Sequence, residues 1–200
     1  YGTIDLATGT GESYVIYGIA QMMLGLGIVD RVLVLCPSIT IETELTDKFK
    51  QLCADANLRK LIPDKAVIKN PRVINADSSV MNGDICIENI HAVYENTGSS
   101  IKDSFIGTGE RVLVLNDEAH HIFNKITNRA DDDVKKWKDF LCSSEYDFKY
   151  ILGFTGTAYI EDDYFADVIY RYSLRHAIDE KVVKNIDYVR EDDSIDQDEK

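Results

Sequence analysis

Short apolar runs alternate with segments of helical periodicity along most of this chain, and this alternation constrains the fold more than any other feature. Residues 31–37 read RVLVLCP and residues 111–115 read RVLVL, so neither run shows the polar alternation of a half-exposed strand. Uninterrupted apolar strands are typical of parallel sheets whose two faces are both covered by helices. The pattern therefore predicts an α/β domain with a mostly parallel central sheet between two helical layers.

The expected elements follow one another as strand, loop and helix. We expect strands at 2–6, 31–37, 84–87, 111–115, 149–154 and 168–172, with a further one at 186–189. Helical periodicity is found at 13–26, 41–57, 118–126, 133–141 and 174–180. The composition changes after Thr157, where the regular alternation ends.

Charge and cysteine usage exclude several classes of protein. The formal net charge is −13, which has the wrong sign for a surface that binds phosphate everywhere, although a local strip of Lys and Arg stays compatible with nucleic acid. Part of the excess lies in the acidic and polar segment 187–200, expected to be a solvated tail. Four separated cysteines without a CxxC pair indicate free thiols, and no apolar run approaches the roughly 18 residues of a membrane span. We therefore predict a cytoplasmic protein.

A glycine-rich loop joins the first strand to the first helix. It reads ATGTGES, and its candidate nucleotide-binding residues are Thr8, Gly9, Thr10, Gly11, Glu12, Ser13 and Tyr14. Glycines let successive N–H groups point into one concavity at a helix N-terminus, where phosphate binds. Ser13 stands where a hydroxyl joins the shell of Mg²⁺, and Glu12 stands where the standard loop has a lysine. Taken alone, the stretch is equally compatible with a plain turn.

Two adjacent carboxylates follow the apolar strand 111–115. The segment reads NDEAH, and the carboxyl end of a parallel strand is the edge at which such sheets bind ligands. Asp117 is placed to hold Mg²⁺ through its water shell, and Glu118 to take a proton from an attacking water. A lone DE pair more often starts a solvated helix, but the apolar strand directly before it favours the catalytic interpretation.

Small hydroxyl residues follow the strand 149–154. Thr155, Gly156 and Thr157 are placed to hydrogen-bond the acidic cluster and report on the nucleotide site, although this signal alone is weak. A modest basic stretch, Lys48, Lys50, Arg59, Lys60 and Lys65, could meet a phosphate backbone or form a solvated helix face.

In this order and spacing, ATGTGES, DEAH and TGT resemble motifs I, II and III of the DEAD/DEAH-type superfamily 2 helicases. NDEAHH and GFTGTAY are especially similar to the Res subunit of type III restriction enzymes and related phage-defence helicases. The resemblance implies a RecA-like P-loop NTPase domain at 1–160, a connector toward a second RecA-like domain at 161–190 and an acidic tail at 191–200. It also implies that strand 149–154 lies between strands 2–6 and 111–115.

The resemblance further implies ATP and Mg²⁺ as cofactors and DNA, rather than RNA, as partner. Pro37 and Ser38 fall in motif Ia and Asn89 in motif Ib, on the nucleic-acid track, while His120 couples the nucleotide site to motif III. A second RecA-like domain, other domains and a modification subunit are implied partners. We expect a helicase or translocase fragment that is inactive alone, because Glu12 replaces the motif I lysine and motifs IV to VI are missing. The alternatives are a degenerate, non-hydrolysing scaffold and a small-molecule P-loop kinase, which has no need of TGT on a separate strand.

Overall fold

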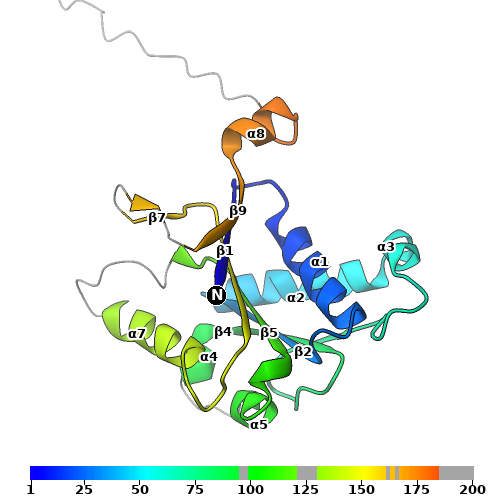
Figure 1. Cartoon of the computed structure of the whole chain (residues 1–200), viewed down its shortest axis with the longest axis vertical. Helices are drawn as coiled ribbons and strands as arrows, with labels where there is room; N and C mark the ends of the chain where they lie inside the picture. Colours follow the sequence, from blue (N-terminus) through cyan, green and yellow to red (C-terminus); the bar gives the residue numbers. More distant parts are fainter. Residues whose placement is uncertain (95–98, 121–129, 161–162, 165–166, 185–200) are drawn as a thin grey trace, which may run out of the picture.

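A computed structural model describes residues 1–94, 99–120, 130–160, 163–164 and 167–184 (Figure 1). The strands are β1 (Gly2–Leu6), β2 (Arg31–Cys36), β3 (Arg72–Ile74), β4 (Asp84–Asn89), β5 (Val112–Asn116), β6 (Tyr150–Thr155), β7 (Tyr159–Ile160), β8 (Asp163–Tyr164) and β9 (Val168–Tyr172). The helices are α1 (Glu12–Gly25), α2 (Ile39–Ala54), α3 (Ala56–Leu61), α4 (Ile90–Tyr94), α5 (Ile101–Phe105), the 3₁₀ turn η1 (Gly109–Arg111), α7 (Ala130–Leu141) and α8 (Leu174–Asp179).

Seven strands form one sheet in the order β3-β4-β2-β5-β6-β1-β9, and every pairing in it is parallel. β6 pairs with β1 on one side and with β5 on the other, so the predicted position of this strand is confirmed. The predicted α/β class is confirmed as well. β7 and β8 make a separate antiparallel pair.

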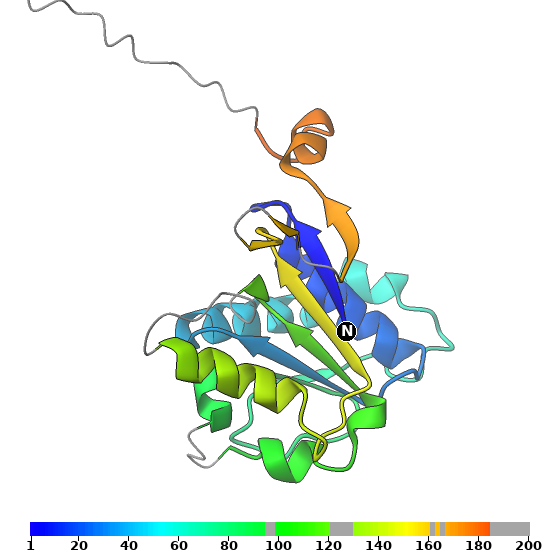
Figure 2. The ribbon, with the colours of Figure 1, turned by 60° about the vertical axis from the view of Figure 1, so that its left-hand side comes forward.

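Helices cover both faces of the sheet, as Figures 1 and 2 show. Side chains alternate between the faces along each strand, so Val32 and Val34 pack beneath α1 and α2, while Leu33 and Leu35 pack on the side of α5 and α7. Because both faces are buried at the centre of the sheet, β2 and β5 need apolar residues at consecutive positions. This requirement explains the uninterrupted runs of the sequence.

Two predicted helices differ from the observed ones. The helix expected at 41–57 ends at Ala54, because Asp55 leaves the helical conformation and its side chain accepts hydrogen bonds from the N–H groups of Asn57 and Leu58, which start α3. The helix expected at 118–126 does not begin at Glu118, whose φ of 52° belongs to a turn; its residues 121–126 lie outside the described ones.

The segment after the predicted ATPase domain contributes to the main sheet. β9 pairs with β1 at the edge of the sheet, and α8 follows it, as expected for residues 168–172 and 174–180. The strand expected at 186–189 and the acidic tail fall outside the described residues. Within the part of the chain that is described, no helix combines the length and the apolar character that crossing a bilayer requires.

Candidate nucleotide and nucleic-acid site

The glycine-rich loop connects β1 to α1 as predicted. Gly9 and Gly11 have φ values of 82° and 91°, a conformation that side chains with a Cβ rarely adopt. The N–H and the hydroxyl of Thr10 both donate to the carbonyl of Ala7, at 3.2 and 2.6 Å, and this closes the turn. The loop therefore delivers the chain from the carboxyl end of β1 into the first turn of α1, where Glu12 and Ser13 lie.

The acidic turn after β5 is held by its neighbours. The N–H of Asp117 donates to the carbonyl of Leu35 in β2 at 2.8 Å, and the N–H of Ala119 donates to the carbonyl of Phe154 in β6 at 2.7 Å. Glu118, between them, takes the left-handed φ of 52°. These tertiary hydrogen bonds, rather than a helix start, fix the backbone of the acidic pair.

Motif II and motif III residues contact each other. Nδ1 of His120 lies 3.1 Å from the Thr155 hydroxyl and 3.1 Å from Oε2 of Glu118. The Thr155 oxygen also accepts the N–H of Thr157 at 3.0 Å. The predicted coupling residues thus form a connected chain from the Glu118 carboxylate to the end of β6.

Motif III also lies against the glycine-rich loop. A Cβ added to Gly156 would stand 3.1 Å from the Thr8 hydroxyl and 3.2 Å from the carbonyl of Leu6. These distances are shorter than most contacts of a Cβ atom, so a larger residue at position 156 would need the Thr8 side chain or the neighbouring backbone to shift. β1 and β5 are two strand spacings apart, about 10 Å, and end at the same edge of the sheet. All three motifs therefore gather at one rim.

Glu12 points its charge toward this rim. Burial, followed by the negative charges of Asp117 and Glu118, raises the pKa of Glu12 to about 8. Its Oε1 atom is buried and has no hydrogen-bond partner among the residues that the structure describes. Burial and then the Glu118 charge likewise raise the pKa of Asp117 to about 6. The surroundings of Glu12 and Asp117 therefore disfavour the ionised form of both carboxyl groups.

These residues fit Mg-ATP poorly at one position. Ser13, partly exposed in the first turn of α1, and Asp117 are suitable oxygen ligands for Mg²⁺. Among the described residues, however, no group of three or more His, Cys, Asp or Glu side chains is arranged to hold a metal ion. A carboxylate at the position of the lysine repels the phosphate chain, so Glu12 and a bound triphosphate are incompatible while Glu12 is ionised.

Tyr14 contacts α2 through Lys48. Its hydroxyl accepts a hydrogen bond of 2.6 Å from Nζ of Lys48, which also lies 4.2 Å from the ring centroid. The Tyr14 side chain is 53% exposed. Of the basic stretch, Lys48 therefore contacts a residue of the loop helix α1.

The predicted nucleic-acid residues meet at the neighbouring part of the edge. Cys36 of β2 is in register with Asn89 of β4, so Pro37 and Ser38 directly follow the strand beside Asn89. The Ser38 hydroxyl caps α2 by accepting the N–H of Ile41. Asn89 accepts the N–H of Ala92 in the first turn of α4, and donates its own N–H and its side-chain amide to Glu42. The side chains of Ser38 and Asn89 are thus engaged inside the fold.

Three polar contacts near the site were not predicted. Glu42 is the acceptor that holds Asn89, the buried Asp5 of β1 forms a 3.1 Å ion pair with Arg171 of β9, and Asn116 accepts the indole N–H of Trp137. An acid within the apolar run GTIDL and an amide that ends RVLVLN each required a buried partner. Asp5 and Asn116 could therefore have been recognised from the sequence. Nothing in the sequence around Glu42 indicates its contact with Asn89.

Comparison with known proteins identifies relatives of the same fold. The family model described as the res subunit of type III restriction enzymes matches residues 1–160. A nuclease-deletion mutant of the Type ISP restriction-modification enzyme LlaGI, in complex with a DNA substrate mimic, is 14% identical with a TM-score of 0.55; the match covers 90% of this chain and 18% of that one. A DEAD box protein from Methanococcus jannaschii is 16% identical with a TM-score of 0.53, over 86% and 45% of the two chains.

The UvsW helicase from bacteriophage T4 is 14% identical with a TM-score of 0.47, over 86% of this chain and 54% of that one. The chain thus spans between 18% and 54% of these solved chains. A search of curated proteins gave no match. Because the family model matches residues 1–160, the chain belongs to the family of the res subunit of type III restriction enzymes, and it has the fold of the first RecA-like domain of a superfamily 2 helicase.

Proposed function

We propose that the chain carries the nucleotide half-site and part of the nucleic-acid track of an ATP-dependent DNA helicase or translocase, with Glu12 blocking nucleotide use. The observation that supports this proposal is the gathering of Thr8, Gly156, Asp117 and Glu118 at one rim of the sheet. A polyphosphate site needs a glycine turn, a metal-binding acid and a general base within reach of one another. Family membership adds independent support.

Each residue of the rim has a proposed role. Ser13 and Asp117 would hold Mg²⁺, which, when bound with ATP, supplies charge neutralisation for phosphoryl transfer. Glu118 would orient and deprotonate water, and its contact with His120 links it to Thr155 and Thr157. His120 thus positions the base and connects it to motif III.

The proposed nucleic-acid track lies beside the nucleotide rim, at Pro37, Ser38 and the start of α4. Since the Asn89 side chain is engaged with Glu42 and α4, we propose that Asn89 orders the track rather than contacting a strand directly. DNA is the proposed partner, and the complex of the LlaGI relative with a DNA substrate mimic supports this choice. A second RecA-like domain and a modification subunit are further proposed partners.

Glu12 determines whether the half-site works. Above about pH 8, where Glu12 is ionised, repulsion replaces the attraction that a lysine would supply. Two unit charges 4 Å apart interact by about 4 kcal/mol at an effective dielectric near 20, so this exchange removes several kcal/mol from nucleotide binding. The buried, unpartnered Oε1 atom of Glu12 supports a second candidate function. In that case the chain is a scaffold of helicase fold that neither binds nor hydrolyses ATP.

Titration of a fluorescent Mg-ATP analogue into the chain and three variants tests this proposal. Glu12→Lys is expected to bind at least about 100-fold more tightly than the wild type, since each 1.4 kcal/mol corresponds to tenfold in affinity. Glu12→Gln, which removes only the repulsion, should lie between them above about pH 8 and bind like the wild type well below that pH, where Glu12 is protonated. Glu44→Lys makes the same charge change at an exposed position of α2 and should leave binding unchanged.

Two results would contradict the motor-domain proposal. Absence of binding in both the wild type and Glu12→Lys, with both proteins folded by circular dichroism, favours the scaffold. Equally tight binding by the two proteins shows that Glu12 does not block the site. Binding of single-stranded DNA, followed by fluorescence anisotropy, tests the proposed track separately.

A further inference from the structure

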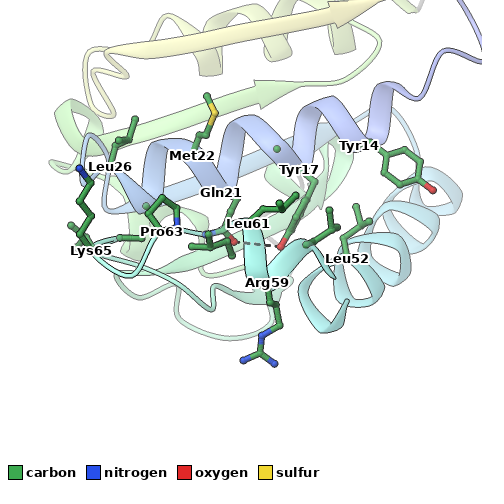
Figure 3. Close-up of a pocket in the computed structure, with 16 residues that line it drawn as sticks. Tyr14, Tyr17, Gln21, Met22, Leu26, Leu52, Arg59, Leu61, Pro63 and Lys65 are labelled. Carbon is green, nitrogen blue, oxygen red and sulfur yellow. Dashed lines mark hydrogen bonds between the residues drawn. The ribbon is translucent and has the colours of Figure 1, made fainter. Parts of the chain in front are cut away.

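A second concave site runs along α1, on the side of that helix that faces α2 and α3. It has a volume of about 700 Å³, within the range of 300–1,000 Å³ typical of ligand sites, and its lining is mostly apolar (Figure 3). We call it the α1–α3 groove. Its main lining residues are Tyr17, Gly18, Met22, Leu58, Leu61 and Val67.

The walls of the α1–α3 groove are held in place by the fold itself. The N–H of Val67 donates to the carbonyl of Gly25 at 2.8 Å, and the amide of Gln21 donates to the carbonyl of Ile68 at 3.1 Å. The Tyr17 hydroxyl reaches Sγ of Cys53 at 3.4 Å. The loop after α3 is therefore tied to α1, and the groove exists without an occupant having to open it.

Gly18 leaves the middle of α1 uncovered. No described atom outside its own helix segment lies within 4 Å of the position that a Cβ would take. Glycine inside a helix costs about 1 kcal/mol relative to alanine, and it normally serves a close approach of another group. Since no described part of this chain makes that approach, the open space at Gly18 suits a group from another molecule.

The rim of the groove is apolar and exposed. Met22, Leu26, Leu61 and Val67 are 61%, 66%, 77% and 68% exposed. A small molecule inside the groove would leave these side chains in water. An amphipathic helix laid along the groove would cover the rim and the interior together, which is the usual mode of helix-in-groove recognition.

The charged residues of the groove are basic, in contrast to the acidic chain. Arg59 and Lys65 line it, and neither forms an ion pair with any residue that the structure describes. The chain as a whole has a net charge of −13. An occupant with acidic residues beside its apolar face would therefore find its complement here and be repelled by much of the remaining surface.

We propose that the α1–α3 groove binds an amphipathic helix with acidic flanks, contributed by a partner protein. The helix places a bulky apolar side chain over Gly18 and sets its carboxylates beside Arg59 and Lys65. Of the candidate nucleotide-binding residues, the groove shares Tyr14, and no motif II or motif III residue lines it, so the proposal does not rest on nucleotide binding.

A labelled 16-residue helical peptide with leucines along one face and glutamates on both flanks serves as the probe. Fluorescence anisotropy compares it with the same peptide carrying lysines in place of the glutamates. The glutamate peptide is expected to bind about tenfold more tightly. Gly18→Leu should fill the groove and weaken that binding at least about tenfold, while the melting temperature stays equal or rises because leucine favours the helix.

Arg59→Glu should reduce or abolish the preference for the glutamate peptide. Lys102→Glu, the matched change at an exposed position of α5, should leave it intact. The proposal is overturned if the two peptides bind equally or if Gly18→Leu binds as the wild type does. It is also overturned if sedimentation shows a self-association that Gly18→Leu abolishes, or if only a small apolar dye binds.

Discussion

The carboxyl edge of the sheet carries buried or half-buried acids at two places, and they differ in their hydrogen bonds. Near β2 and β4, Glu42 accepts two hydrogen bonds from Asn89, and Glu88 accepts the N–H of Ala76 at 2.8 Å. Near β1 and β5, the Oε1 atom of Glu12 has no partner and faces the charges of Asp117 and Glu118. One acidic group organises the fold, while the other concentrates unsatisfied charge.

The presence or absence of hydrogen-bond donors distinguishes acids that hold the fold together from acids of the candidate site better than burial does. Burial raises the pKa of Glu88 to about 7, but its hydrogen bonds from Ala76 and Asn89 act in the opposite direction. At Glu12, each of the causes raises the pKa. A buried acid without donors is destabilising, which makes Glu12 a candidate for a role other than holding the fold together.

The largest effect is expected from Asn89→Ala. This substitution removes the cap of α4 and leaves Glu42 without the amide that it accepts from, so the free energy of unfolding should fall by about 3 kcal/mol. Urea denaturation measures it. The matched control Asn57→Ala lies at an exposed position and should change stability by less than about 0.5 kcal/mol. A similarly small change in stability for Asn89→Ala would show that the hydrogen bonds between Asn89 and Glu42 do not stabilise the fold.

Gly156→Ala should destabilise the protein by about 2 kcal/mol, because the new methyl group crowds Thr8 and the carbonyl of Leu6. Combining it with Thr8→Ala removes one of the two crowded atoms and should restore at least about 0.5 kcal/mol. Strict additivity of the two substitutions in thermal or urea unfolding would show that motifs I and III do not touch.

Glu12→Gln should stabilise the chain in a manner that depends on pH. The folded pKa of Glu12, about 8, exceeds its ordinary value of 4.5, so the folded state binds more protons and Glu12 lowers stability increasingly as pH rises from 4.5 to 8. After discounting for solvent screening, we expect the variant to gain about 1.5 kcal/mol above pH 8 and nothing near pH 4.5. Unfolding curves of Glu44→Gln, the same substitution at an exposed position of α2, provide the reference.

The smallest effect is expected at Thr155, which contacts both His120 of motif II and Thr157 of motif III at the candidate nucleotide rim. Thr155→Val removes the oxygen that accepts the N–H of Thr157 and contacts His120, at a cost of about 1 kcal/mol. Thr155→Ser keeps the hydroxyl and should retain most of that stability. Equal losses in the two variants would assign the effect to packing of the Thr155 methyl group.

The sequence was most informative where both faces of a strand are buried. β2, β5 and β6 appear as apolar runs because helices cover both of their sides, and the position of β6 between β1 and β5 was implied by the resemblance to superfamily 2 helicases. β3 was not predicted, since its three residues are only partly buried or exposed and leave no apolar run. The break at Asp55 was missed because an N-cap inside a periodic segment resembles a helical surface residue.

The sequence predicted the types and the spacing of the candidate site residues better than their geometry. The types and spacing of the Gly11, Asp117 and Thr155 segments suggested a common rim, and the structure places them along one edge of the sheet. The left-handed backbone of Glu118 depends on carbonyls from two other strands, which no local pattern encodes. The engagement of Asn89 by Glu42, 47 positions away, is invisible for the same reason.

Because the acidic turn is fastened to strands on both flanks, its position cannot be adjusted independently of them. Leu35, whose carbonyl anchors Asp117, stands two residues before Pro37, and Phe154, whose carbonyl anchors Ala119, directly precedes Thr155. A displacement of either strand end is thus transmitted to the carboxylates through a single peptide group. Movement of the Pro37 loop or of motif III would therefore shift the Glu118 carboxylate through these two backbone hydrogen bonds.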